Sequence, residues 1–160
     1  MPKYSVDTNE GLAWLAGLFD GEGSINMQKL GKASCNGNVI LTQKNTSVVA
    51  AAVYVCERYE LPTPLEYDRE RGVKRLMWPS IRGAGFLLAI LPWMNHSKQR
   101  RRAALYIERY NLKNRGKGNR NSQDAIWERW KELVSIEAAE GDACSERFLT
   151  RLNLVKEGDE

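Results

Sequence analysis

The chain has 160 residues, of which 42% are hydrophobic and 28% charged, a composition typical of a globular protein that can bury a core without disulfides. This length predicts one domain and excludes an enzyme with separate cofactor and substrate modules. Three cysteines without CxxC spacing and a single histidine exclude a Cys/His zinc site. No apolar run is long enough to span a membrane, and the first residues form neither a secretory signal nor a transit peptide, so we expect a soluble intracellular protein.

The formal net charge of +4 is distributed unevenly along the chain. Residues 1–95 carry 10 basic and 9 acidic side chains (net +1), residues 96–120 carry 9 and 1 (net +8), and residues 121–160 carry 5 and 10 (net −5). A basic block of this density favours a polyphosphate partner, because each neutralised phosphate releases condensed counterions. A solvated helix balanced by the acidic tail would give the same count.

The first predicted elements are a helix and two strands. Thr8 or Asn9 can cap a helix whose apolar residues recur at helical spacing up to Asp20, after which two glycines end it. Alternation of polar and apolar residues then predicts one strand over 24–28 and a second over 38–44.

A second helix and a second pair of strands follow. The segment 45–47 can cap a helix that continues to Tyr59 and is closed by the prolines of 62–64. Two further strands are expected around a turn at 69–72. We expect one face of this pair to carry Leu65, Tyr67, Leu76 and Trp78, and the other face to carry Glu66, Asp68, Arg75 and Met77.

Helices dominate the rest of the chain. Ser80 can cap a third helix through Leu91, which Pro92 breaks. The remaining expected segments are a fourth helix, a flexible basic linker and one or two short amphipathic helices, at about 95–113, 114–121, 125–139 and 145–154.

This order of elements predicts an α+β fold with a four-stranded antiparallel sheet and helices on one face of that sheet. The other face is left free, and its polar and cationic residues suit either a DNA major groove or a solvated sheet. The residues expected on it are Ser24, Asn26, Gln28, Asn36, Asn38, Thr42, Glu66, Asp68, Arg71, Lys74 and Arg75.

The most informative segment is 14–24. Ala13, Gly17 and Gly21 lie on one helical face, and small residues at this spacing let two helix backbones approach closely. Glu22 follows the expected helix end, where the helix dipole disfavours a carboxylate unless a cation such as a divalent metal is near. The segment fits neither a phosphate-binding loop, which needs a lysine after the glycines, nor an EF-hand, which needs glycine and an acid at positions where they are missing.

At these residues the chain resembles the LAGLIDADG homing endonucleases. The sequence LAGLFDGEG at 15–23 matches that motif at six of its nine positions. The order of elements is similar to the αββαββα core of the family over about 9–113, and 41–44 lies where the family has a Gln-Lys pair. The resemblance implies one endonuclease domain over 1–160, with a saddle-shaped sheet and a C-terminal helical extension over about 121–155.

The motif occurs once. In the family that the chain resembles, chains with one motif form homodimers. The resemblance therefore implies a two-fold dimer whose motif helices pack at Ala13, Gly17 and Gly21. It also implies that two Glu22 carboxylates meet at the foot of the helix pair and hold divalent ions against the scissile phosphates, with the Gly21 carbonyl as a further ligand. Hard oxygen ligands and phosphate select Mg²⁺, and Mn²⁺ or Ca²⁺ could occupy the same site.

The remaining site residues are also implied by the resemblance. Gln43 would order the water network, and a lysine near the start of the fourth helix would stabilise developing charge. Lys98 is the candidate for this lysine, whereas an alignment on Gln99 would put His96 there. We assign Asp20 to helix capping and the dimer seam rather than to the metal.

The sequence thus predicts an intron- or intein-encoded endonuclease that binds a long near-palindromic double-stranded DNA site as a homodimer and hydrolyses a phosphodiester in each strand, in the cytoplasm or in an organelle. Neither a membrane nor a small-molecule substrate is expected. The alternatives are a non-catalytic protein of the same fold, either an RNA-splicing maturase or a DNA-binding regulator, and a structural domain with a fortuitous motif. The residues expected to contact DNA are Ser24, Asn26, Gln28, Asn36, Asn38, Thr42, Lys44, Arg71, Lys74, Arg75, Arg100 and Arg101.

Overall fold

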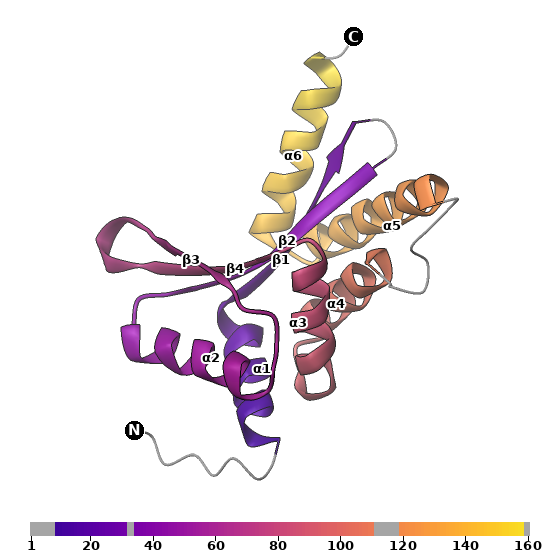
Figure 1. Ribbon diagram of the computed structural model, residues 1–160. Coiled ribbons are helices and arrows are strands. Elements are labelled where there is room, and N and C mark those ends of the chain that lie inside the picture. The colour runs from indigo at the N-terminus through magenta and orange to yellow at the C-terminus, as the bar shows by residue number, and fades with distance from the viewer. Residues whose placement is uncertain (1–8, 32–33, 111–118, 159–160) are drawn as a thin grey trace.

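The computed structural model describes residues 9–31, 34–110 and 119–158, with side chains for 123–152 in the last range. The expected linker at 114–121 lies outside these residues except for its last three, which belong to a helix. The elements, shown in Figure 1, are α1 (Glu10–Glu22), β1 (Gly23–Leu30), β2 (Ser34–Gln43), α2 (Thr46–Arg58), β3 (Leu65–Asp68), the 3₁₀ helix η1 (Glu70–Gly72), β4 (Lys74–Pro79), α3 (Ile81–Ile90), the 3₁₀ helix η2 (Leu91–Trp93), α4 (Ser97–Arg109), α5 (Asn119–Ala139) and α6 (Ala143–Gly158).

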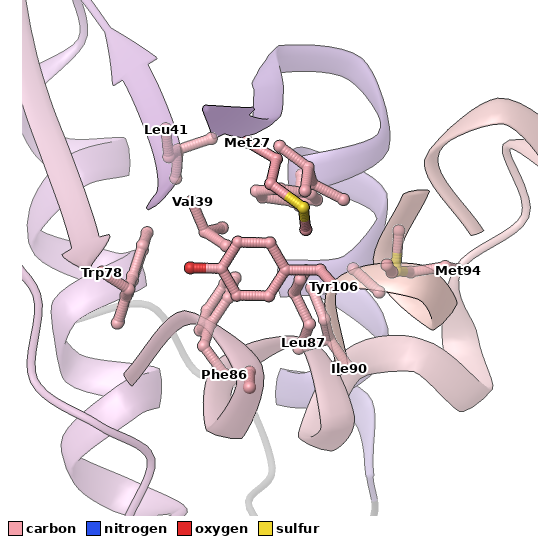
Figure 2. Packing of buried hydrophobic residues seen from close by; sticks show 14 of the residues in the cluster. Met27, Val39, Leu41, Trp78, Phe86, Leu87, Ile90, Met94 and Tyr106 are labelled. Atoms are coloured by element: carbon pink, nitrogen blue, oxygen red, sulfur yellow. The ribbon is translucent and has the colours of Figure 1, made fainter. Parts of the chain in front are cut away.

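The predicted α+β fold is confirmed. The strands form one antiparallel sheet in the order β1-β2-β4-β3, and the helices pack on one of its faces (Figure 1). Between sheet and helices lies a core in which Trp78 stacks on Phe86 with ring centroids 4.0 Å apart. Figure 2 shows the Tyr106 ring within this core, beside Val39. Among the described residues, no helix has the length and apolar character needed to cross a bilayer.

Helix α1 buries an apolar stripe and ends where the sheet begins. Leu12, Leu15 and Phe19 recur at helical spacing and are buried. The helix continues two residues beyond its expected end at Asp20, because the N–H of Gly23 still bonds to the carbonyl of Phe19. A Cβ at Gly23 would lie 2.4 Å from the Phe19 ring, so only glycine permits this direct passage from helix to strand.

The first hairpin is longer than the alternation of residues predicts. Strand β2 starts at Ser34 rather than at 38, and Lys29 pairs with Cys35. Cys35 is fully buried, and a Cβ at Gly37 would lie 2.5 Å from the carbonyl oxygen of Asn26. A small buried residue and a glycine therefore allow the close packing that extends the strand.

The second hairpin corrects one expectation. Leu65 pairs with Met77, and Tyr67 pairs with Arg75. Residues directly opposite each other point to the same face, so Leu65 and Tyr67 lie on the free face and not with the buried Leu76. The reason is that β3 is an exposed edge strand, so burial does not select its register.

The same register moves three polar residues off the free face. Alternation along the strands puts Glu66, Asp68 and Lys74 on the face that carries Leu76. Lys74 pairs there with Asp68, with 3.7 Å between the ammonium nitrogen and a carboxylate oxygen. Arg71, also expected on the free face, lies instead in the exposed η1 turn with a φ of 61°.

The predicted starts of α2, α3 and α4 have different outcomes. Asn45 caps α2, because its side chain accepts bonds from the backbone N–H groups of Ser47 and Val48. Ser80 does not cap α3: its φ is 50°, and its hydroxyl donates to Asn36 Oδ1 at 2.8 Å. Helix α4 begins at 97, two residues later than expected.

The C-terminal helices are longer than expected and belong to the helical layer. The backbone N–H of Cys35 donates to Gln123 Oε1 of α5 at 3.1 Å. Helix α6 packs against α5, where Trp127 and Phe148 meet edge to face at 6.1 Å. The acidic C-terminal segment therefore packs on the same chain's core.

Candidate functional site

The foot of α1 presents two kinds of oxygen donor. Glu22 is the last residue of the helix, and both Glu22 and Gly21 are exposed. The last four carbonyls of a helix lack intrahelical partners, and that of Gly21 is among them. A carboxylate and a backbone carbonyl are thus available in consecutive residues.

Asp20, two residues earlier, is held by the protein itself. Its Oδ2 accepts hydrogen bonds from the backbone N–H groups of Asn95 at 2.7 Å and His96 at 3.2 Å, directly before α4. Its Oδ1 is buried without a hydrogen-bond partner among the described residues. Asp20 therefore ties the motif helix to the start of α4.

Helix α4 is attached to the same foot. The side-chain amide of Gln99 donates to the carbonyl oxygen of Gly23, the residue after Glu22, at 2.7 Å. The neighbouring Lys98 places its Nζ 2.7 Å from Asp142 Oδ1, in the turn between α5 and α6. His96, the other residue considered for the basic position, is exposed at the N-cap of α4.

Gln43 lies at the end of β2 that faces the same region. Gly23 pairs with Leu41, so the last residues of β2 run beside the foot of α1. The Gln43 Oε1 accepts from the backbone N–H groups of Lys44 at 2.9 Å and Asn45 at 3.2 Å. These bonds fix the side chain at the start of the turn into α2.

The free sheet face gathers most of the polar residues expected there. Asn26 pairs with Asn38, and their side chains are joined by a hydrogen bond of 3.5 Å. Asn36 faces Gln28 in the register, but its Oδ1 accepts from the hydroxyls of Ser80 and Tyr110. The predicted residues that the register places on this face are Ser24, Asn26, Gln28, Asn36, Asn38, Thr42 and Arg75.

Of the apolar residues on this face, only Met77 was predicted there. Ile40, Met77 and Leu65 are directly opposite one another across β2, β4 and β3, and Tyr67 lies in the next row beside Arg75. Leu65 and Tyr67 are 39% and 43% exposed, and neither side chain belongs to the core. The available signal was the shortness of β3, which is typical of an edge strand whose apolar residues need not be buried.

The basic residues of α4 that were expected to contact DNA contact the protein. Arg100 donates to the carbonyl oxygens of Met94 at 2.7 Å and Leu91 at 3.2 Å. Arg101 lies 4.0 Å from Glu140 and is 45% exposed. The Arg101 side chain is therefore still accessible to a partner. Lys44, which follows β2, is also exposed.

One face of α1 has no covering element among the described residues. Gly17 and Gly21 are exposed, and a Cβ at either position would meet nothing within 4 Å. By contrast, a Cβ at Gly11 would lie 2.7 Å from the Tyr59 ring. Ala13, one turn before Gly17, is half-buried, so the three small residues form an accessible stripe.

The described residues of one chain do not complete a metal site. They contain no group of three His, Cys, Asp or Glu side chains that could hold an ion. Mg²⁺, however, is usually bound by one or two carboxylates together with substrate phosphates and water. The donors at the foot of α1 fit such a partial site.

Comparisons with known proteins bear on the fold. No family model and no curated protein matches the sequence. The chain is similar to the homing endonuclease I-CvuI in complex with its target in the presence of Ca, with 18% identity over 84% of each chain and a TM-score of 0.58. It is also similar to the archaeal intron-encoded homing endonuclease I-Vdi141I complexed with DNA (15% identity, 84% of this chain and 86% of the other, TM-score 0.56).

A third similar structure is the LAGLIDADG meganuclease I-AabMI bound to uncleaved DNA, with 13% identity, 78% of this chain, 42% of the other and a TM-score of 0.53. These identities are low, and what they share with this chain is the arrangement of helices and strands. With the motif in α1, the chain therefore has the fold of the LAGLIDADG homing endonucleases.

Proposed function

We propose that the protein is a site-specific DNA endonuclease that acts as a homodimer and hydrolyses a phosphodiester in each strand of a long near-palindromic duplex. The observation that carries the proposal is the convergence at the foot of α1. Strand β2 and helix α4 both meet Gly23, the residue after Glu22, through the Leu41 pairing and the Gln99 hydrogen bond. This convergence brings the elements of the candidate residues Glu22, Gln43 and Lys98 to one end of the motif helix.

The dimer completes the site. Ala13, Gly17 and Gly21 leave room for a second helix backbone, and a two-fold axis there would bring two Glu22 residues together. The small-residue stripe and the acidic foot belong to one helix, so packing the helices also pairs the acids. Each half of the complex would then face one of the two scissile phosphates.

The site residues have distinct roles in this proposal. The Glu22 carboxylate and the Gly21 carbonyl would hold Mg²⁺, which when bound polarises the phosphate and lowers the pKa of water. Gln43 would order the attacking water, and the ammonium group of Lys98 would stabilise negative charge that develops on the phosphate. The protein therefore positions the reactants and forms no covalent intermediate.

The free sheet face would bind the major groove of each half-site. Amide and hydroxyl side chains on β1 and β2 can pair with base edges, and exposed cations can contact phosphates. Similar structures are DNA complexes, which supports this assignment. We include intron encoding in the proposal, because the similar protein I-Vdi141I is an intron-encoded endonuclease.

The test is cleavage of a duplex that carries the gene flanking this coding sequence, with the insertion removed. We expect the wild type to cut both strands in Mg²⁺, and Glu22→Gln to bind the same duplex but cut it at least ~100-fold more slowly, because a metal ligand is lost. Glu57→Gln, at an exposed position of α2, is the matched control and should cut normally.

Two results would contradict the proposal. Unchanged cleavage by Glu22→Gln would show that this carboxylate is not a metal ligand. Binding of the duplex by the wild type without cleavage in Mg²⁺ or Mn²⁺ would favour the alternative, a non-catalytic nucleic-acid-binding protein such as a maturase or a regulator.

A further inference from the structure

The turn between α5 and α6 reaches back to the candidate catalytic lysine. Lys98 Nζ lies 2.7 Å from Asp142 Oδ1, and the two side chains are 27% and 25% exposed. The second carboxylate oxygen of Asp142 accepts from the backbone N–H of Ser145 at 2.9 Å and from its hydroxyl at 2.5 Å. Asp142 thus caps α6 with one oxygen and binds Lys98 with the other.

A buried network holds this turn in place. Arg102, one turn after Lys98 on α4, donates to Glu137 Oε2 at 2.9 Å and to the Ser145 hydroxyl at 3.0 Å. The same guanidinium donates to the carbonyl oxygen of Ile25 in β1 at 3.3 Å. Arg102 and Glu137 are 8% and 1% exposed, so the turn is anchored to both α4 and the sheet.

Asp142 keeps its negative charge at neutral pH. The hydrogen bond from Lys98, followed by that from Ser145, lowers the pKa of Asp142 to about 2. The Asp142 carboxyl group is therefore ionised near neutral pH. An ammonium group has three N–H donors, so the bond to Asp142 leaves two for a phosphate.

We propose that Asp142 is a positioning residue that holds the ammonium group of Lys98 beside the foot of α1. The inference rests on the proposed function of Lys98. Lys98 precedes Gln99, which bonds to the Gly23 carbonyl, so its backbone is already fixed near that foot. Its long side chain would otherwise sample many rotamers, and the bond to Asp142 selects among them before DNA binds.

The proposal gives the C-terminal helices a role in catalysis. They supply no group to the reacting phosphate, but their turn orients one that does. The acidic C-terminal block then does more than balance the charge of the basic middle block, because one of its carboxylates acts on a specific lysine.

The test compares Asp142→Asn with the wild type on the duplex that the wild type cuts. Asparagine caps a helix as well as aspartate does, so α6 should remain intact and the thermal midpoint should change little. We expect kcat to fall about tenfold while the Kd for DNA and the KM stay within about twofold, because only transition-state stabilisation is lost. Asp142→Glu, which keeps the charge, should recover part of the lost rate.

A double variant shows whether Asp142 acts through Lys98. Lys98→Met should itself slow cleavage, and adding Asp142→Asn should slow it no further, since the two residues form one unit. Glu108→Gln is the matched control: it breaks the exposed 2.6 Å pair of α4 with Arg129 of α5 and should leave kcat unchanged.

The outcomes separate the two proposals. If the wild type cuts no duplex, the proposed function and this inference both fail. If the wild type cuts and Asp142→Asn has the same kcat, or if the effects of Lys98→Met and Asp142→Asn multiply, Asp142 does not position Lys98 and only this inference is overturned.

Discussion

Two acids on α1, two residues apart, have different surroundings. Residues at this spacing are about 200° apart around a helix, so Asp20 and Glu22 point to different sides. Asp20 meets two backbone N–H groups before α4, whereas Glu22 is exposed at the helix end. Asp20 is thereby tied to the start of α4, and the Glu22 carboxylate stays accessible to the cation that we propose.

This difference between the two acids predicts distinct results for two variants of Asp20. Asp20→Asn keeps an oxygen that accepts from Asn95 and His96, so we expect cleavage within about threefold of the wild type. Asp20→Ala removes that oxygen and should lower the free energy of unfolding by about 1 kcal/mol, the usual cost of a lost cap. Cleavage rates and urea unfolding check both results. Loss of cleavage in Asp20→Asn at unchanged stability would instead make Asp20 a metal ligand.

The roles of some single residues could be predicted from the sequence, and those of others could not. Glu22 and Gly17 could be located because helical periodicity places them at a helix end and on a small-residue face. The bond between Lys98 and Asp142 could not be, because 44 residues separate the two and no local pattern records the contact. Ser80 failed as a predicted cap because its hydroxyl is drawn to Asn36 across the sheet.

At the scale of elements, predictability followed burial. The faces of β1 and β2 could be predicted because buried residues alternate with polar ones along both strands. The faces of β3 could not, since all its residues are exposed and matching Leu65 with Leu76 by hydropathy alone shifted the register by one. The free face consequently carries an apolar row that composition did not indicate.

The uncovered face of α1 predicts how a large side chain at Gly17 will act. Gly17→Leu should abolish dimerisation, because two helix backbones can no longer approach closely. The monomer should remain folded and gain up to about 1 kcal/mol from helix propensity, because a Cβ at Gly17 meets nothing within 4 Å. Sedimentation and thermal unfolding measure the two effects.

The control for that variant is Gly83→Ala in α3. A Cβ there would lie 2.7 Å from a Val39 methyl and 2.8 Å from the Trp78 carbonyl oxygen, so the fold should lose stability. Its remaining folded fraction should still dimerise. A normal dimer formed by Gly17→Leu would place the subunit contact on another surface.

At the scale of the whole molecule, a buried ion pair attaches the C-terminal helices to the core. Arg102 of α4 and Glu137 of α5 lie between α4, α5 and the start of α6. Removing one partner of such a pair leaves the other charge buried without compensation, whereas removing both does not. The sequence indicated helices in this region, but the pairing that fixes their position depends on contacts between distant segments.

This attachment predicts an asymmetry between single and double variants. Arg102→Met should lower the free energy of unfolding by about 3–5 kcal/mol, and the double variant Arg102→Met/Glu137→Met should recover most of that loss. Arg129→Met, which breaks an exposed pair, should cost less than about 1 kcal/mol. Urea unfolding followed by tryptophan fluorescence reports all three. Equal losses in the single and double variants would show that packing, not charge pairing, holds the helices.

We propose that two copies of the chain bring their Glu22 residues together on DNA, and cross-linking at this position decides whether they do. The protein for the test is Glu22→Cys in a Cys144→Ser background, since Cys35 and Cys56 are buried. With duplex bound, a short bismaleimide should join two chains through position 22. A cysteine at the exposed Tyr54 of α2 should not cross-link. If the Glu22→Cys protein reacts fully with a monofunctional maleimide yet yields no covalent dimer on DNA, the paired-acid site does not exist.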